Sequence, residues 1–155
     1  MKRQHIDVRA HTTAHPDTVY ALLRDGASWP QWSPIGSFEL EQPADGEDPE
    51  GVGAIRVFRS RWRGSKVTSR EQVVELVPGR RFSYAFLSGL PLRDYRADVD
   101  LEPTEGGTTI HWRSSFLPKL PGTGWLYRRI LTEFIEACAS GLAEHAARQD
   151  APRRG

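Results

Sequence analysis

Three side chains that can donate or accept a proton lie on segments with the alternation of β-strands. Glu71 shares one face of its segment with Val67 and Val73, and Tyr84 and Tyr95 lie on the apolar faces of the two segments that follow. A carboxyl or phenol group held among apolar side chains has a shifted pKa and can serve as a general acid or base. Glu71, Tyr84 and Tyr95 are therefore the candidate catalytic residues.

An arginine must share the apolar face of the predicted strand 52–62. If Phe58 faces inward, so does Arg56, because side chains alternate along a strand. If Val57 faces inward instead, the inward arginine is Arg59. A buried charge without a partner is too costly to persist, so this residue needs a counter-charge or a wet cavity. The pattern leaves both registers open.

Other catalytic and metal-binding patterns are missing from the sequence. The five histidines form neither an HxH nor an HExxH pattern and Cys138 is the only cysteine, so we expect no metal site and no internal disulfide. The segment GVGAIR lacks the third glycine of a dinucleotide-binding fingerprint, and we expect no cofactor. Cys138 lies on an apolar helical stripe and is interpreted as a small core residue.

The charge balance argues against nucleic acid as a partner. The chain has 155 residues and a formal net charge of +1, although Arg59, Arg61 and Arg63 share one strand face. No run approaches the roughly 20 apolar residues of a membrane-spanning helix, and the N-terminal residues carry no signal-peptide pattern. We expect a cytoplasmic protein without stable membrane insertion. Eighteen arginines against three lysines indicate a bacterial source.

The elements that would position these residues follow a simple order of strand, short helices, six strands and one long helix. Strands are predicted at 4–13, 35–43, 52–62, 65–77, 81–88, 92–102 and 108–117, and helices at 15–25 and 124–148. The connections are short, which predicts an antiparallel sheet. One long helix cannot fill the width of a curved seven-stranded sheet, so the remaining concave space predicts a cavity.

The segment SWPQWSPIG is expected at one end of this cavity. Trp29 and Trp32 are three residues apart on one short turn, so their rings point to similar sides. Trp32 is interpreted as a core or cavity-wall residue, and Trp29 as a gate at the rim.

The chain resembles the START-like, helix-grip (SRPBCC) superfamily, in its polyketide cyclase/dehydrase-like branch. The residues that carry the resemblance are AHPDTVYALLRDGASWPQWSP, GVGAIRVF, EQVVELVPGRRFSYAF and YRADVDLEPTEGGTTIHWRSSF, and it spans about residues 4–147. It implies an α+β, Bet v 1-like fold, in which a seven-stranded antiparallel sheet wraps around a long C-terminal helix and two short helices follow the first strand. Residues 1–148 would form this single domain, with 149–155 as a disordered tail.

The resemblance implies a hydrophobic cavity between the sheet and the C-terminal helix, with Arg56 and Glu71 favoured as its polar end. In the alternative, both residues face solvent in a lattice of surface charges. The expected ligand-binding residues are Trp29, Trp32, Arg56, Phe58, Glu71, Tyr84, Phe86, Tyr95, Trp112, Phe116, Phe134 and Cys138.

Three functions remain open from the sequence. The leading hypothesis is binding of a hydrophobic or aromatic small molecule, such as a lipid or a polyketide, without a cofactor. The second is a polyketide aromatase/cyclase or dehydratase that uses the same cavity. The third is a ligand-responsive interaction or stress protein. The sequence does not determine the oligomeric state.

Overall fold

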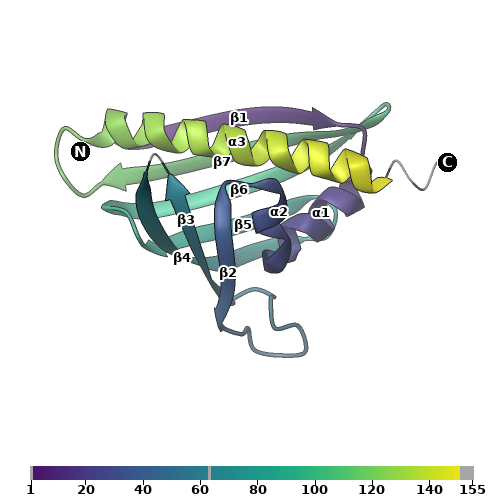
Figure 1. Cartoon of the computed structure of the whole chain (residues 1–155), viewed down its shortest axis with the longest axis horizontal. Helices are drawn as coiled ribbons and strands as arrows, with labels where there is room; N and C mark the ends of the chain where they lie inside the picture. Colours follow the sequence, from purple (N-terminus) through teal and green to yellow (C-terminus); the bar gives the residue numbers. More distant parts are fainter. Residues whose placement is uncertain (1, 63, 151–155) are drawn as a thin grey trace.

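The order of elements predicted from the sequence is present in the computed structural model, which describes residues 2–62 and 64–150 (Figure 1). The elements are β1 (Gln4–Thr12), α1 (Pro16–Arg24), the 3-10 turn η1 (Gly26–Ser28), α2 (Trp29–Trp32), β2 (Ile35–Gln42), β3 (Ile55–Trp62), β4 (Ser65–Val77), β5 (Arg81–Ser88), β6 (Leu92–Thr104), β7 (Gly107–Pro118) and α3 (Gly124–Asp150).

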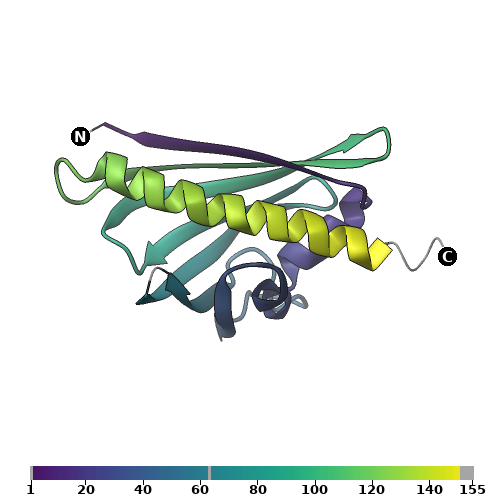
Figure 2. The same ribbon diagram turned by 45° about the horizontal axis from the view of Figure 1, so that its top comes forward.

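All seven strands form one antiparallel sheet in the order β1-β7-β6-β5-β4-β3-β2. The sheet curves, and α3 lies along its concave side beside β1 and β7, while α1 and α2 close the end near the C-terminus of α3 (Figures 1 and 2). This arrangement confirms the predicted α+β helix-grip fold. The largest difference in the strand limits is β3, which begins at Ile55 rather than at 52, because Gly53 has a left-handed backbone (φ +100°).

Helix α1 forms where the sequence places a cap, a proline and an apolar stripe in succession. The His15 ring nitrogen Nδ1 accepts a hydrogen bond from the backbone N–H of Asp17 at 3.1 Å, and Pro16 occupies the first turn. Val19, Leu22 and Leu23 are buried, as the pattern predicted. This packing fixes where α1 ends and therefore where α2 starts.

The last turn of α3 is fastened to the start of α1. The carboxylate of Asp150 accepts hydrogen bonds from the backbone N–H of His15 and the hydroxyl of Thr18, both at 2.8 Å. Of the tail expected to be disordered from 149 to 155, Gln149 and Asp150 therefore belong to α3. Residues 151–155 lie outside the described part of the chain.

The inward face of α3 is only partly buried in the first half of the helix and fully buried in the second half. Cys138 and Leu142 are fully buried as the apolar stripe predicted, and Ile135, which the stripe omitted, is buried with them. The predicted stripe residues Tyr127, Ile130, Leu131 and Phe134 are only partly buried. In the part of the chain that the structure describes, no helix is long and apolar enough to cross a membrane.

Helix α3 passes very close to α2 at Gly141. A Cβ atom added at Gly141 would lie 1.7 Å from the backbone oxygen of Trp32, far inside van der Waals contact. Any side chain at this position must therefore push α3 away from α2. Glycine is therefore required at this position by the close approach of the two helices, although it has a lower helix propensity than other residues.

We expect Gly141→Ala to lower the free energy of unfolding by about 2–3 kcal/mol, because overpacking outweighs the gain in helix propensity. Urea denaturation followed by circular dichroism measures this change. Ser140→Ala is the matched control, since Ser140 is exposed on the same turn of α3 and its substitution should not destabilise. An unchanged or raised stability of Gly141→Ala would contradict the close approach of the two helices.

Candidate functional site

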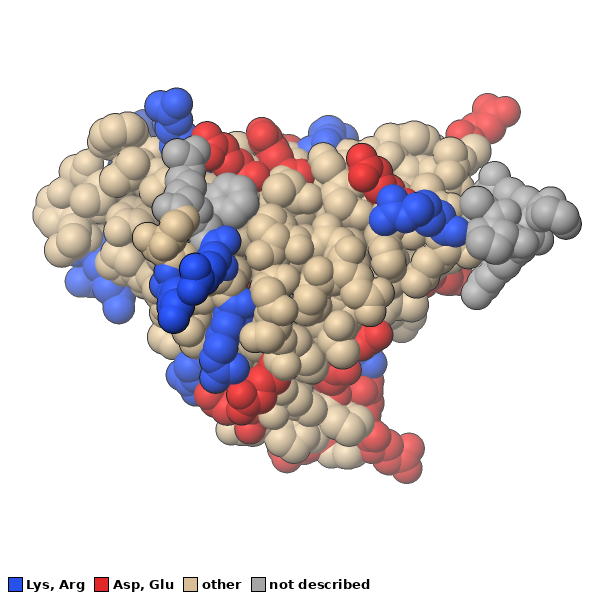
Figure 3. Space-filling model, viewed as in Figure 1, with Lys and Arg blue, Asp and Glu red and all other residues tan. Residues whose placement is uncertain are grey.

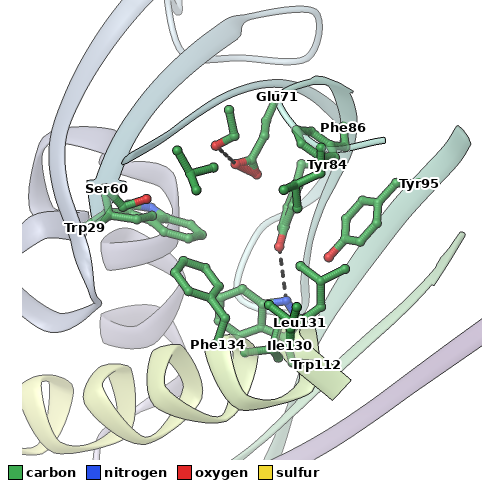
Figure 4. A pocket seen from close by; sticks show the side chains of 15 residues that line it. Trp29, Ser60, Glu71, Tyr84, Phe86, Tyr95, Trp112, Ile130, Leu131 and Phe134 are labelled. Atoms are coloured by element: carbon green, nitrogen blue, oxygen red, sulfur yellow. Dashed lines mark hydrogen bonds between the residues drawn. The ribbon is translucent and has the colours of Figure 1, made fainter. Parts of the chain in front are cut away.

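A cavity of about 110 Å³ lies between the concave face of the sheet and α3 (Figure 4). Its walls come from α2, the six strands β2 to β7, the β5–β6 turn and the first half of α3. The lining residues are Trp29, Ile35, Ser60, Val67, Ser69, Glu71, Tyr84, Phe86, Leu90, Tyr95, Trp112, Ile130, Leu131, Phe134 and Ile135. Aromatic and aliphatic side chains dominate this surface, and Glu71 is its single ionisable carboxyl group.

The burial of the lining residues shows where the cavity opens. Trp29, Tyr84 and Trp112 are buried and form its inner wall. In contrast, Val67 and Leu90 from the β3–β4 hairpin and the β5–β6 turn are half-buried, and so are the α3 lining residues other than Ile135. The opening therefore lies between the first half of α3 and the tips of these hairpins.

Trp29 is an inner-wall residue, and its expected role as a gate at the rim is wrong. Its side chain is 2% exposed, and its indole N–H donates to the backbone oxygen of Leu23 at 3.1 Å. The Trp32 indole N–H donates to the hydroxyl of Ser28 at 3.1 Å, and the two indole centres are 4.6 Å apart. Both rings are therefore enclosed in the core.

Strand β3 takes the register that points Arg56 and Phe58 inward. Their exposed fractions are 2% and 1%, whereas Arg59 is exposed and its guanidinium lies 3.1 Å from a carboxylate oxygen of Glu39. The carbon of the Arg56 guanidinium lies 5.0–5.9 Å from the ring centres of Phe58, Trp29, Phe82 and Phe38. We refer to these four rings as the aromatic cage of Arg56.

The cage holds a charged group with few hydrogen bonds. Arg56 Nη1 donates to the backbone oxygen of Leu23 at 3.2 Å, and no carboxylate of the described residues forms an ion pair with it. Burial lowers the pKa of Arg56 to about 10, so the guanidinium is still protonated at neutral pH. Attraction between the cation and the faces of the rings offsets part of the desolvation cost.

Glu71 lies directly opposite Arg56 on the neighbouring strand β4 and forms the polar part of the cavity wall. The Ser69 hydroxyl donates to its carboxylate at 3.5 Å. Burial raises the pKa of Glu71 to about 7, although the positive charge of Arg56 and the Ser69 contact both favour the ionised form. The carboxyl group can therefore both give and take a proton near neutral pH.

The two candidate tyrosines lie beside each other on β5 and β6, with ring centres 6.3 Å apart. The Tyr84 hydroxyl oxygen accepts a hydrogen bond from the Trp112 indole N–H at 3.3 Å, and its own phenolic proton is available to a second acceptor such as the Tyr95 hydroxyl. Burial raises the pKa of Tyr84 and of Tyr95 well above the ordinary value. Both phenols are therefore neutral donors at neutral pH.

The structure places the twelve expected ligand-binding residues in two groups. Those that line the cavity are Trp29, Glu71, Tyr84, Phe86, Tyr95, Trp112 and Phe134. The others, Trp32, Arg56, Phe58, Phe116 and Cys138, are buried around it without lining it. Burial raises the pKa of the Cys138 thiol, which suits a core residue. Arg56 thus stands behind Trp29 and acts on the cavity through its charge.

Sequence reasoning did not assign eight of the cavity-lining residues to ligand binding. They are Ile35, Ser60, Val67, Ser69, Leu90, Ile130, Leu131 and Ile135. Ile130 and Leu131 were visible only as part of the helical stripe, and Val67 only as a neighbour of Glu71. Among the described residues, no group of three His, Cys, Asp or Glu side chains could hold a metal ion.

The curved sheet, its covering helix and the apolar cavity between them define a helix-grip cavity protein. Residues 3–147 match the profile of the family described as polyketide cyclase / dehydrase and lipid transport. The chain belongs to this family. No curated protein sequence matches the chain.

Solved structures from distant organisms share the fold. A START superfamily protein from Mycobacterium smegmatis is 15% identical, with a TM-score of 0.79 over 94% of this chain and 98% of that one. The ZhuI aromatase/cyclase from Streptomyces sp. R1128 is 16% identical, with a TM-score of 0.73 over 96% of each chain. Ara h 8.0201 is 16% identical, with a TM-score of 0.71 over 94% of this chain and 98% of that one.

Arg56→Lys should lower the free energy of unfolding by about 1–2 kcal/mol, because an ammonium group cannot stack on the surrounding rings and is more strongly hydrated. Thermal or urea denaturation tests this. Arg59→Lys is the control on the same strand, and its effect should stay within about 0.5 kcal/mol because Arg59 is exposed. Equal effects of the two substitutions would argue against the aromatic cage.

The raised pKa of Glu71 predicts that stability falls as pH rises from about 4.5 to about 7. In this range the folded state keeps the proton that the unfolded state releases, so the derivative of the unfolding free energy with pH is negative. Glu71→Gln should remove this slope and stabilise the protein at pH 8 by about 2–3 kcal/mol relative to the wild type. Denaturant titrations of both proteins at pH 5 and pH 8 measure the difference.

Glu41→Gln is the contrasting control for this pH experiment. The hydrogen bond from Arg70 lowers the pKa of the exposed Glu41 carboxylate. The stabilisation that Glu41 provides is therefore present above its ordinary pKa and lost as pH falls. The change of unfolding free energy with pH thus has the opposite sign to that of Glu71. If both variants showed the same pH dependence, Glu71 would not be the group responsible.

Proposed function

We propose that residues 1–148 act as a single domain that binds a hydrophobic or aromatic small molecule, such as a lipid or a polyketide, in the cavity beneath α3. The observation that carries the proposal is the composition of the wall, in which apolar rings surround one carboxyl group, Glu71. Membership of a family that is described by polyketide chemistry and lipid transport supports it.

The size of the cavity limits what it can hold without rearrangement. At about 110 Å³ it is close to the volume that accepts a single benzene-like ring. A longer or fused-ring ligand requires the half-buried side chains at the opening, including Phe86, Ile130 and Phe134, to move apart. These residues are long or aromatic and lie at one end of the cavity, so they can change rotamer without disturbing the inner wall.

The polar groups of the wall suggest how the ligand is oriented. Glu71 lies on β4, and the hydroxyl groups of Tyr84 and Tyr95 come from the next two strands (Figure 4). A ligand with one carbonyl or hydroxyl group can bond to these donors while the rest of it contacts apolar side chains. Few polar contacts in an apolar pocket are typical of sites that select a ligand by shape.

A second candidate function is an aromatase/cyclase or dehydratase acting on a poly-β-keto chain. The specific observation in its favour is the pKa of Glu71 near 7, beside neutral phenols that can polarise a carbonyl group. In this reaction Glu71 removes a proton from the carbon between two carbonyls, and Tyr84 or Tyr95 donates a hydrogen bond to the developing enolate oxygen.

Binding is tested by native mass spectrometry of the purified protein, followed by tryptophan fluorescence titration with fatty acids, flavonoids and polyketide mimics. Val67→Phe should fill the opening and weaken binding about tenfold or more, because it occupies the space that the ligand enters. Thr68→Phe is the matched control, since Thr68 is exposed and points away from the cavity. Equal binding by both variants would overturn the assignment of the cavity as the binding site.

Turnover separates the two candidate functions. If the protein is a cyclase, Glu71→Gln and Tyr84→Phe abolish or strongly reduce conversion of a poly-β-keto mimic while its binding is retained. If it is a carrier, no conversion is observed with the wild type, and Tyr84→Phe changes affinity alone.

A further inference from the structure

The end of the molecule beside the cavity opening carries large apolar side chains that are exposed in the described part of the chain. Trp125 is 59% exposed, Leu120 is 56% exposed and Leu126 is 40% exposed. All three lie in the loop between β7 and α3 or in the first turn of α3. We call these three residues the apolar tip. Large apolar side chains gathered on one projecting loop mark a contact surface rather than random exposure.

The apolar tip lies next to the residues at the opening of the cavity. The backbone N–H of Lys119 donates to the oxygen of Pro91 at 2.9 Å, which holds the loop against the β5–β6 turn. Leu90 in that turn lines the cavity, and so do Ile130 and Leu131, one turn beyond the tip on α3. The tip and the opening of the cavity are therefore parts of one surface.

Basic side chains surround the apolar tip. Arg128 and Arg129 follow it on α3, Lys119 precedes it, and Arg93 lies on the neighbouring start of β6. All four are exposed, and none forms an ion pair within the described part of the chain. Arg61 and Lys66 add two exposed charges on the hairpin at the other side of the opening.

Acidic groups near the tip are fewer. Asp94 is paired with Arg3, and Glu133 lies further along α3. In Figure 3 the leftmost end of the molecule shows Lys and Arg beside uncharged surface, whereas Asp and Glu lie along the upper and lower edges and toward the right-hand end. Although the net charge of the whole chain is only +1, the exposed basic side chains beside the tip outnumber the acidic ones.

We propose that the apolar tip and its basic rim dock the protein on the surface of an anionic lipid bilayer. Exposed Trp and Leu side chains enter the boundary between headgroups and acyl chains, and the basic side chains contact the headgroups. A protein partner with an acidic surface would match the charges, but it would not account as well for a tryptophan and two leucines on a projecting loop. Docking in this way turns the cavity opening toward the bilayer.

This inference stands apart from the proposed ligand, because it rests on side chains outside the cavity. Its test is co-sedimentation of the full chain with vesicles of phosphatidylcholine alone and of phosphatidylcholine mixed with phosphatidylglycerol. The protein should sediment with the anionic vesicles, and binding should weaken as salt is raised. Trp125→Ala should reduce partitioning roughly tenfold, and Arg128→Gln with Arg129→Gln about 30-fold.

Two matched controls come from elsewhere on the surface. Val52→Ser removes an exposed apolar side chain from the β2–β3 loop, and Arg148→Gln removes an exposed charge from the other end of α3. Both should bind vesicles like the wild type. Circular dichroism melting confirms that every variant is folded, so a loss of binding reports on the surface.

Tryptophan fluorescence gives an independent measurement. Emission of the wild type should shift to shorter wavelength when anionic vesicles are added, and Trp125→Phe should abolish that shift while retaining most of the binding. The proposal is overturned if the protein sediments with neither kind of vesicle, or if the control substitutions weaken binding as much as those in the tip. Capture by an acidic protein without any binding to vesicles would also overturn it.

Discussion

The enclosure of the Arg56 guanidinium by aromatic rings is the interaction on which the site depends. The backbone oxygen of Leu23, in the last turn of α1, accepts hydrogen bonds from both Arg56 and the Trp29 indole. This carbonyl has no partner within its own helix and lies at the negative end of the helix dipole. One buried cation therefore joins α1, α2 and β3, and it sets the depth at which Trp29 forms the inner wall of the cavity.

The same cation shapes the chemistry of the cavity without entering it. Glu71 is opposite Arg56 in the sheet, but it faces the cavity rather than closing an ion pair. Desolvation of the carboxyl group exceeds the attraction of the nearby charge, so the pKa of Glu71 rises to about 7 instead of falling. A direct ion pair would have held the proton away at neutral pH. Because the Arg56 guanidinium and the Glu71 carboxyl group are not in direct contact, Glu71 can still exchange a proton near neutral pH.

Periodicity was sufficient to predict the strands and the long helix, because each has one apolar face, whereas the helix-grip fold was implied by the resemblance to a known superfamily. Periodicity could not choose the register of β3, since Ile55 and Val57 are buried on the outer face while Arg56 and Phe58 are buried on the inner one. Nor could it place the cavity opening, whose residues come from a hairpin, a turn and a helix distant in sequence. The role of Trp29 was predicted wrongly because spacing within a turn does not reveal how deeply that turn is buried.

The pairing of β1 with β7 determines how late in its synthesis the chain can fold. Strand β1 leaves the ribosome before the other strands of the sheet and has no partner there until Gly107–Pro118 has been made, and the start of α1 awaits its contact with Asp150 at the end of α3. Most of the chain is therefore synthesised before its early segments can be sequestered. Folding of this topology is dominated by contacts distant in sequence, so it is slow, and the apolar face of β1 is exposed to chaperones and to aggregation in the interval.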